Sequence, residues 1–399
     1  MCSMQPTPPA DPLVGAVLDG RYRVDAPIAT GGMSTVYRGL DVRLDRPVAL
    51  KVMDSRYAGD QQFLTRFQRE AKAVARLKDP GLVAVYDQGL DGRHPFLVME
   101  LVEGGTLREL LRERGPMPPH AAAAVLGPVL SGLAVAHRGG LVHRDVKPEN
   151  VLISDDGEVK IADFGLVRAV AEAQITSTSV ILGTAAYLSP EQVGTGTAGP
   201  GSDVYAVGIL AFEILTGTTP FNGDSPLAVA YQRMDHDVPP PSTVIAGVPA
   251  EFDELVLRAT ARDPADRFAD ALEMGAAVDD LVDALGLPPF RVPAPRNSAE
   301  HASAALYHSR LDERQDATDD ITSSASPAAA PEPPRHHTRV MMAPPPVRDQ
   351  FAGIDIADFQ WARQRAKRVL LMWVIAVITL TGLLAAGAWT LGTNLPNLL

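Results

Sequence analysis

The sequence predicts an α+β protein: a strand-rich amino-terminal part, then a helix-rich part, a loose tether and one membrane-spanning helix. Residues 21–102 carry short strand patterns separated by turns, with one helical pattern among them. From residue 103 to about residue 285, helical patterns dominate. Residues 369–391 are uncharged and almost wholly apolar, and about 20 such residues suffice to cross a bilayer as a helix.

Composition limits the kind of protein. The chain has 399 residues, enough for one large domain with accessory segments, and a hydrophobic fraction of 46% predicts that most of it folds. A formal net charge of −12 argues against a general nucleic-acid binder. Cys2 is the single cysteine, so an internal disulfide is impossible, which fits a reducing compartment. No apolar amino-terminal signal peptide is visible.

Several elements can be assigned in order along the chain. Residues 1–18 are rich in proline, and we expect them to be flexible. Residues 48–52 predict a strand, and helices are predicted over residues 106–114 and 119–137. A disordered juxtamembrane linker is expected over residues 288–368 because apolar periodicity is lost there. One more helix is predicted by apolar residues at steps of three and four, at Phe63, Phe67, Ala71, Val74 and Leu77.

Two short segments indicate the chemistry. Residues 143–150 read His-Arg-Asp-Val-Lys-Pro-Glu-Asn, and Asp-Phe-Gly follows at residues 163–165. Phosphoryl transfer needs a group that accepts the proton of the attacking hydroxyl, and Asp145 can supply it. It also needs a divalent cation against the phosphates, which Asn150 and Asp163 can hold.

These segments resemble the catalytic loop and the metal-binding loop of the eukaryotic-type protein kinases. About the first 285 residues are similar to the bacterial Ser/Thr kinases of this type, above all to the membrane-anchored mycobacterial kinases. The resemblance implies a two-lobed protein kinase fold over residues 19–287, with a β-rich N-lobe at 19–102 and an α-helical C-lobe at 103–287. It also implies ATP and Mg²⁺ (or Mn²⁺) between the lobes, and transfer of the γ-phosphoryl group to serine or threonine of protein substrates.

By the same resemblance, the amino-terminal part supplies the phosphate contacts. Lys51, in Val-Ala-Leu-Lys, matches the strand lysine that contacts the α- and β-phosphates, and Glu70 matches the helix carboxylate that pairs with this lysine. Residues 28–36 lie where the glycine-rich loop should be. The loop departs from the family pattern because Ala29 replaces its first glycine and Ser34 its third, so ATP binding is expected to be weaker but not abolished.

The resemblance also predicts which residues surround the nucleotide. In the glycine-rich loop these are Ala29, Gly31, Gly32 and Met33, with Gly31 at the central position where backbone approaches the phosphates. The hinge is predicted to offer backbone hydrogen bonds from Glu100 to Val102. An apolar adenine pocket is predicted from residues that are equally consistent with an ordinary core, namely Ile28, Val36, Ala49, Met99, Val102 and Leu152.

Other C-lobe residues match positions with defined roles. Lys147 follows Asp145 by two positions, near the transferred phosphate, and favours serine and threonine over tyrosine as substrates. Glu191, in Ser-Pro-Glu, is expected to pair with Arg267. Asp203 is expected to brace the backbone of the catalytic loop.

A run of hydroxyl residues lies in the expected activation segment, between Asp163 and Glu191. Thr176 and Thr178 are predicted autophosphorylation sites, because a phosphate adds about −1.5 to −2 charge and can pair with Arg144. Phosphates at these positions also predict the docking of phosphothreonine-binding partners.

Resemblance to the mycobacterial kinases implies a back-to-back homodimer through the N-lobes. Arg21, Leu44 and Asp87 fall at the matching positions, and they are equally consistent with ordinary surface residues. A symmetric contact presents the same patch on both partners, so it would bring one kinase close enough to phosphorylate another.

The apolar segment at residues 369–391 predicts a single transmembrane helix in the cell membrane. The alternative, a buried core helix, would show polar spacing on one face, which this segment lacks. Basic residues precede the segment and none follows it, so the kinase domain is expected in the cytoplasm. Residues 392–399 are expected to form a short extracellular tail, too small for a sensor domain. The basic residues are Arg363, Arg365, Lys367 and Arg368.

Two other functions are consistent with parts of the pattern. A pseudokinase scaffold would explain the altered glycine-rich loop, but the full set of catalytic residues argues against it. A small-molecule kinase on the same fold is disfavoured by the Gly-Thr and Ser-Pro-Glu elements of a peptide-binding segment at residues 183–191. The catalytic residues that argue against the pseudokinase scaffold are Lys51, Glu70, Asp145, Asn150 and Asp163.

Overall fold

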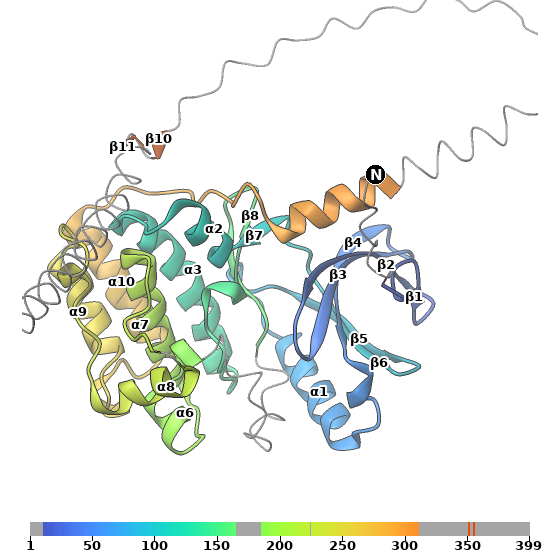
Figure 1. The fold of residues 1–399 in the computed structure, drawn as a ribbon, viewed down its shortest axis with the longest axis horizontal. Helices are drawn as coiled ribbons and strands as arrows, with labels where there is room; N and C mark the ends of the chain where they lie inside the picture. Colours follow the sequence, from blue (N-terminus) through green and yellow to red (C-terminus); the bar gives the residue numbers. More distant parts are fainter. Residues whose placement is uncertain (1–10, 165–184, 224, 311–349, 352–353, 356–399) are drawn as a thin grey trace, which may run out of the picture. The chain divides into compact units, whose positions relative to one another are not determined.

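The computed structural model describes residues 11–164, 185–223, 225–310, 350–351 and 354–355. A strand-rich lobe and a helical lobe lie side by side (Figure 1), which confirms the predicted two-lobed α+β fold. Residues 334–399 belong to a separate unit, of which the structure describes a hairpin of β10 (Gln350–Phe351) and β11 (Ile354–Asp355). The predicted transmembrane segment at residues 369–391 lies outside the described residues.

The N-lobe is an antiparallel sheet of six strands in the order β1-β2-β3-β4-β6-β5, with one helix against it. Val48, Leu50 and Val52 of β4 are buried at every second position, as expected for one face of a strand. The helix α1 (Gln61–Val74) buries the predicted apolar face and ends before Leu77. The other elements are β1 (Val17–Leu18), β2 (Tyr22–Thr30), β3 (Ser34–Asp41), β4 (Arg46–Met53), η1 (Ser55–Tyr57), β5 (Val85–Asp91) and β6 (His94–Met99).

The amino terminus differs from the predicted flexible stretch over residues 1–18. Leu13 and Val14 pack against the core of the sheet, and the Tyr37 hydroxyl donates to the Asp11 carboxylate at 2.8 Å. The prediction is therefore wrong for residues 11–18. The cause is that apolar side chains cover the end of the sheet, a contact that proline content does not reveal. Residues 1–10 lie outside the described part.

The C-lobe is built around the buried helices α3 (Pro119–Arg138) and α7 (Pro200–Thr216). The predicted helices at 106–114 and 119–137 are confirmed as α2 (Leu107–Arg114), capped by Thr106, and α3. The remaining elements are β7 (Gly104–Thr106), η2 (Pro148–Asn150), β8 (Val151–Ser154), β9 (Val159–Ile161), η4 (Ala185–Tyr187), α6 (Pro190–Gly194), α8 (Pro226–Asp235), η5 (Pro241–Thr243), α9 (Ala250–Ala259), η6 (Pro264–Asp266) and α10 (Ala271–Leu285).

Within the described residues, α3 is the helix long and apolar enough to cross a membrane. Its most apolar window is 61% buried inside the C-lobe, where it packs against α7 and α10. We therefore interpret α3 as the core helix of this lobe, because its apolar surface already has protein partners.

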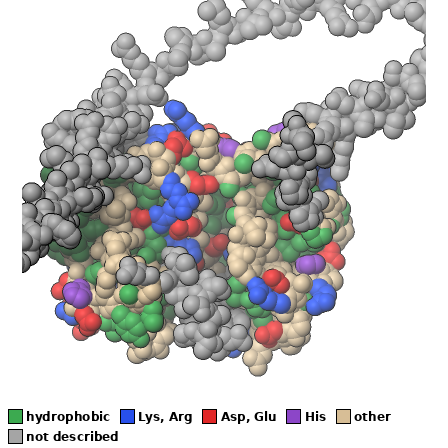
Figure 2. All heavy atoms as spheres, viewed as in Figure 1, with side chains coloured by type: hydrophobic (Ala, Val, Ile, Leu, Met, Phe, Trp, Pro, Cys, Tyr) green, Lys and Arg blue, Asp and Glu red, His purple; other side chains and the backbone are tan. Residues whose placement is uncertain are grey.

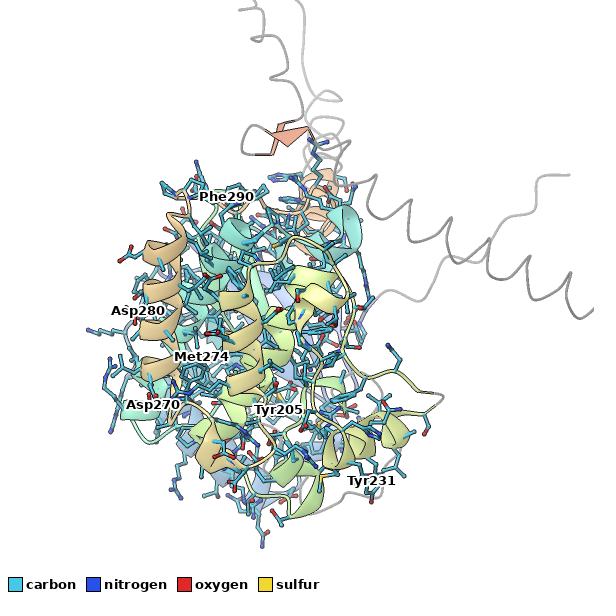
Figure 3. The ribbon with its side chains drawn as sticks, turned by 90° about the vertical axis from the view of Figure 1, so that its left-hand side faces the viewer. Tyr205, Tyr231, Asp270, Met274, Asp280 and Phe290 are labelled. Carbon is cyan, nitrogen blue, oxygen red and sulfur yellow. The ribbon has the colours of Figure 1, made fainter. Side chains whose placement is uncertain are left out.

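The chain stays on the domain after α10. Figure 3 shows Asp270, Met274 and Asp280 along α10, and Phe290 just beyond its end. The ring of Phe290 stands edge-on to that of His120 in α3, with 5.0 Å between centroids. An edge-on aromatic contact of this kind holds the chain against the C-lobe.

The predicted disordered linker therefore begins too early in the sequence. Residues 288–310 pack against the domain, and residues 299–310 form a helix. The prediction is wrong for these residues because they bury Val292 and Ser303, each 1% exposed, in spite of their proline- and alanine-rich composition. Residues 311–349 lie outside the described part.

Candidate active site

The catalytic-loop residues converge on one carboxylate. Lys147 Nζ lies 2.8 Å from Oδ2 of Asp145, and Asn150 Nδ2 lies 3.2 Å from the same oxygen. Asn150 also donates to the backbone carbonyl of Asp145 at 2.7 Å. The Asp145 carboxylate is thus fixed in place by a cation and an amide of its own loop.

Asp203 of α7 holds this loop from the core side. Its carboxylate accepts hydrogen bonds from the backbone N–H groups of His143 and Arg144 at 2.7 and 2.8 Å, the bracing contact predicted from the sequence. Arg144 has a φ of 66°, a conformation that costs free energy in a residue other than glycine. His137 Nε2 lies 2.9 Å from the same carboxylate, a contact for which no motif in the sequence gave a signal.

Asp163 connects the N-lobe to the catalytic loop. Its Oδ1 lies 2.7 Å from Nζ of Lys51 in β4. Burial opposes ionisation of this carboxyl, but the charge and hydrogen bond of Lys51, together with the charges of His143 and Lys147, hold the pKa of Asp163 below its ordinary value. The neighbouring Phe164 is buried, with its ring 4.7 Å from that of His143.

The predicted Lys51–Glu70 ion pair is not among the ion pairs of the described residues, where Lys51 pairs with Asp163. Glu70 instead lines a cavity of about 500 Å³ between α1 and the catalytic loop, together with Arg66, Arg69 and others. One ammonium group can pair with both carboxylates only if α1 lies close to β4. The distance between α1 and β4 therefore decides the pairing, and sequence spacing does not encode that distance.

The predicted nucleotide residues come from strands of both lobes. In the sheet, Val36 of β3 lies opposite Ala29 of β2 on one side and opposite Lys51 of β4 on the other. Strand pairing therefore fixes the position of the glycine-rich loop relative to Lys51. Gly31 N–H donates to the Ser34 carbonyl at 2.8 Å, which closes the hairpin tip. The placement is Ile28 and Ala29 in β2, Gly31, Gly32 and Met33 at the tip, Val36 in β3, Ala49 and Lys51 in β4, Met99 in β6, Glu100 and Val102 after it, and Leu152 in β8.

The hinge residue Glu100 is already engaged inside the protein. Its backbone N–H donates to the Ala84 carbonyl at 2.8 Å, and its carboxylate pairs with Lys160 Nζ at 2.7 Å. Because this N–H already donates to Ala84, it is not available to a nucleotide. The groups left for the predicted hinge hydrogen bonds are the Glu100 carbonyl and the Val102 backbone.

The donor set can be tested against the expected Mg²⁺. This ion is usually held by one or two protein carboxylates together with waters and substrate phosphates. Asp163, ionised beside Lys51, and the Asn150 amide meet that requirement. Across the described ranges, no group of three or more His, Cys, Asp or Glu side chains could form a metal cage from protein alone. The oxygens of Asp163 and Asn150 are donors of the kind that share this metal with phosphates.

A bidentate ion pair stabilises the C-lobe below the site. Arg267 Nη1 and Nη2 each lie 2.9 Å from an oxygen of Glu191, as the sequence predicted.

Figure 2 shows charged side chains of both signs along the middle of one face, between the strand-rich and helical lobes. The predicted phosphorylation sites Thr176 and Thr178 lie in residues 165–184, outside the described residues.

Comparison with known proteins agrees with this geometry. The family described as "Protein kinase domain" matches residues 22–276. The chain is 65% identical over 404 residues to "Serine/threonine-protein kinase PknL" of Mycobacterium tuberculosis (strain ATCC 25618 / H37Rv), with 98% of each chain covered. The chain belongs to the serine/threonine protein kinase family. The predicted kinase family and enzyme class are therefore confirmed.

Two further relatives match about two thirds of this chain. The kinase is 44% identical over 264 residues to "Serine/threonine-protein kinase PknB" of Mycobacterium leprae (strain TN), an alignment that covers 65% of this kinase and 42% of that protein. The crystal structure of the PknI kinase domain of Mycobacterium tuberculosis is 27% identical, with a TM-score of 0.53, and covers 67% of this kinase and 98% of that chain. The two-lobed kinase fold is confirmed by this likeness.

Replacing Asp203 by Asn should lower kcat by roughly 100-fold, because a misplaced catalytic loop can cost this much. An amide has one acceptor oxygen, so it leaves one of the two loop N–H groups unpaired, at a cost of about 1–3 kcal/mol in stability. Kinetics and urea unfolding would measure both effects. Asp253→Asn, which disturbs the bonds to Ser242 far from the site, should lower stability alone. Equal kcat in the two variants would contradict the bracing role.

Proposed function

We propose that this kinase transfers the γ-phosphoryl group of ATP to serine and threonine hydroxyls of proteins, with Asp145 as the proton acceptor. The observation that carries the proposal is the pair of contacts from Lys147 and Asn150 to one oxygen of Asp145, at 2.8 and 3.2 Å. A carboxylate held in this way needs little reorganisation to accept a proton. Lys147 would also lie near the transferred phosphate, where its positive charge would neutralise developing negative charge.

The remaining roles follow from the position of each side chain. Lys51 would contact phosphate oxygens, and Asn150 and Asp163 would hold Mg²⁺ (or Mn²⁺). When bound, the metal neutralises charge on the phosphates. The hairpin tip at Gly31 and Gly32 would cover the phosphates with backbone N–H groups. A silent scaffold would not need Asp145, Lys147 and Asn150 to converge, so catalysis is the better account.

We also propose that phosphorylation of Thr176 and Thr178 activates the kinase. Support comes from the cavity of about 500 Å³ beside Phe164, which is lined by Arg66, Arg69 and Arg144 among others. Several guanidinium groups around one cavity suit a phosphate dianion, because charge-assisted hydrogen bonds are the strong ones. Phosphothreonine in this segment would also attract phosphothreonine-binding partners.

We propose a back-to-back homodimer as the route to this phosphorylation. Leu44 is 61% exposed on the N-lobe, so its apolar side chain is accessible to a second copy of the kinase. Arg21 pairs with Asp41 at 2.7 Å and with Asp87 at 3.4 Å, and the Tyr22 hydroxyl donates to Asp87 at 2.6 Å. Arg21 and Asp87 would therefore shape the patch, and Leu44 would make the apolar contact.

Membrane anchoring is proposed from the sequence of residues 369–391. The kinase domain would face the cytoplasm, where ATP is available, because the basic cluster at residues 363–368 favours that side. Signals would then reach the kinase through the helix, a partner protein or the cytoplasm.

Asp145→Asn should lower phosphotransfer about 10²- to 10⁴-fold, because the amide cannot accept the proton. Lys51→Met should lower it roughly 10²- to 10³-fold through the loss of one charge against phosphate. Labelled ATP, Mg²⁺ and a protein substrate would measure both effects. Asp156→Asn and Lys78→Met are matched exposed controls that should retain full activity. Full labelling by both catalytic variants would refute the assignment.

Mass spectrometry of active kinase should detect phosphate on Thr176 and Thr178, and alanine at both positions should lower activity toward an added substrate.

If the homodimer brings about this phosphorylation, the rate of autophosphorylation should increase with kinase concentration. Leu44→Asp should remove this dependence, because a charge in a symmetric apolar patch repels its copy. Unmodified threonines in an active preparation would reject these sites, and an unchanged concentration dependence would reject the dimer.

A topology reporter fused after Leu399 should be active outside the cytoplasm, whereas the same reporter fused after Arg310 should be active inside it. Neutral replacements at Arg363, Arg365, Lys367 and Arg368 should make the orientation less uniform, because basic residues favour the cytoplasmic side. Reporter activity measured in intact cells tests both points. Cytoplasmic activity of the fusion after Leu399 would overturn the proposed span.

A further inference from the structure

The chain returns across both lobes after the last C-lobe helix. Residues 288–310, here called the strap, run from the end of α10 past β7 to the N-lobe sheet (orange in Figure 1). The helical part, residues 299–310, lies along the strand-rich lobe. Contacts of the strap with both lobes make it a second connection between them, in addition to the hinge at residues 100–102.

The first part of the strap is attached to the C-lobe. The Arg296 N–H donates to Glu113 Oε2, and the Ala299 N–H donates to Glu109 Oε1, each at 2.8 Å. The second bond satisfies a backbone donor at the start of the strap helix, where no intrahelical partner exists.

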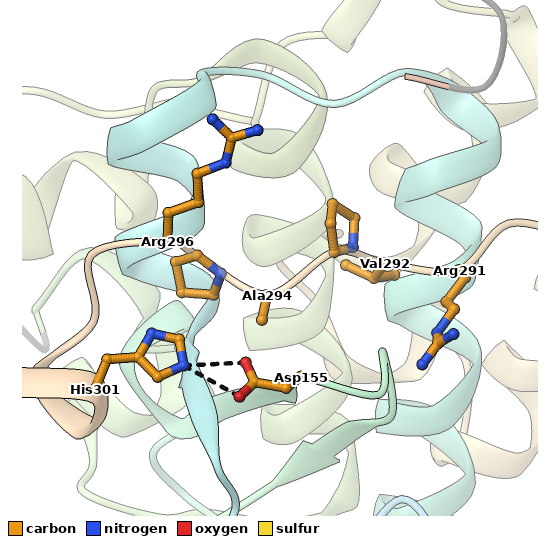
Figure 4. A pocket seen from close by; sticks show the side chains of 8 residues that line it. Asp155, Arg291, Val292, Ala294, Arg296 and His301 are labelled. Atoms are coloured by element: carbon orange, nitrogen blue, oxygen red, sulfur yellow. Dashed lines mark hydrogen bonds and ion pairs between the residues drawn. The ribbon is translucent and has the colours of Figure 1, made fainter. Parts of the chain in front are cut away.

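His301 adds a side-chain contact at the start of this helix. Figure 4 shows its ring directed at Asp155, with Nε2 at 3.0 Å from Oδ1 and 3.2 Å from Oδ2. Asp155 follows β8, so this contact holds the strap helix to the small sheet of the C-lobe. The cavity seen in Figure 4, about 370 Å³, lies between the strap and Asp155.

Gly105 allows the strap to approach the chain just after the hinge. A Cβ at this position would lie 2.4 Å from Pro295 Cγ and 2.7 Å from Ser298 Cβ, closer than packed atoms approach. Gly105 follows Val102 of the predicted hinge by three positions. The strap therefore packs beside the segment about which the lobes would turn.

The helical part is attached to β2, one of the two strands that flank the glycine-rich loop. Arg310 Nη1 donates to the Asp25 carbonyl at 2.9 Å. Arg23 Nη2 donates to the Tyr307 hydroxyl at 3.1 Å. These bonds hold the strap helix against the N-lobe at two points separated by one helical turn.

Glu300 connects the lobes directly. Its carboxylate pairs with Arg38 of β3, and Arg38 also pairs with Glu103, just after the hinge, at 2.8 Å. The Glu300 and Arg38 side chains are 7% and 12% exposed. Burial raises the pKa of the Glu300 carboxyl, and the charge of Arg38 acts in the opposite direction. Arg38 is two residues from Val36, so both side chains project from the same face of the sheet.

We infer that Glu300 is a positioning residue for phosphoryl transfer. Through Arg38 it holds β3, and with β3 the glycine-rich loop, at the angle to the C-lobe that ATP binding requires. Two lobes joined by a hinge alone can turn about it, whereas a buried ion pair beside the hinge restricts that rotation. This inference rests on the proposed phosphotransferase function.

Kinetics of the full-length chain test the inference. In Glu300→Ala, the KM for ATP should rise roughly tenfold, because a hydrogen-bonded charge pair is lost, while the KM for the protein substrate stays unchanged. Glu300→Gln should show a smaller rise, since its amide oxygen can still accept a hydrogen bond from Arg38. Arg291→Ala is the control, because its ion pair with Asp156 is exposed and lies on the C-lobe alone. It should leave the KM for ATP unchanged.

Hydrogen exchange of the β2 and β3 amides provides a readout that needs no activity, and exchange should be faster in Glu300→Ala than in Arg291→Ala. A lower kcat at unchanged KM for ATP would indicate only a smaller folded fraction and would overturn the inference. A lower KM for ATP, or equal exchange in the two variants, would also overturn it. If Glu300→Ala does not fold, Glu300→Gln provides the same comparison. A wild-type chain without phosphotransfer would refute the proposed function and leave the exchange result to judge the strap.

Discussion

The buried carboxylate of Asp203 is the contact on which the catalytic loop depends. It accepts the N–H groups of His143 and Arg144 and contacts His137, so three segments of the C-lobe meet at one side chain. Arg144 adopts a left-handed conformation, and such a conformation persists only where the surrounding contacts impose it. The position of Asp145 one residue later follows from this constraint, because its backbone continues from the strained residue.

The contacts of the strap differ greatly in what they contribute. The ion pair between Arg291 and Asp156 has side chains 68% and 93% exposed, and pairs of this kind contribute about 0–1 kcal/mol. Glu300 and Arg38 are almost fully buried, and breaking a buried pair costs more than breaking an exposed one. The attachment of the strap to the N-lobe therefore depends on Glu300 more than on any surface charge. In sequence, the strap also lies between the kinase domain and the proposed membrane segment.

The position of α1 links the ion pair at Lys51 to the cavity lined by arginines. Lys51 pairs with Asp163, while Glu70 of α1 lines the same cavity as Arg144 of the catalytic loop. A movement of α1 would therefore change the partner of Lys51 and the spacing of the guanidinium groups together. Lys51, Asp163 and the cavity are best regarded as one coupled unit.

Much of the fold could be predicted because its signals are local. The apolar period of α1 and α3, the strand around Lys51 and the motif at residues 143–150 all depend on neighbours within a few positions. The relation of Glu191 to Arg267 was also predictable, since both positions belong to a known kinase pattern.

The sequence alone determined the fold class and the family, and it predicted the set of catalytic side chains, because each depends on residue type and short spacing. The tertiary structure decided which carboxylate pairs with Lys51, that His137 joins Asp203, and that residues 288–310 pack across both lobes. These features depend on contacts between residues far apart in the chain, such as Arg38 and Glu300, 262 positions apart. The local sequence of residues 288–310 does not show that Arg38, in a distant strand, will be buried against Glu300.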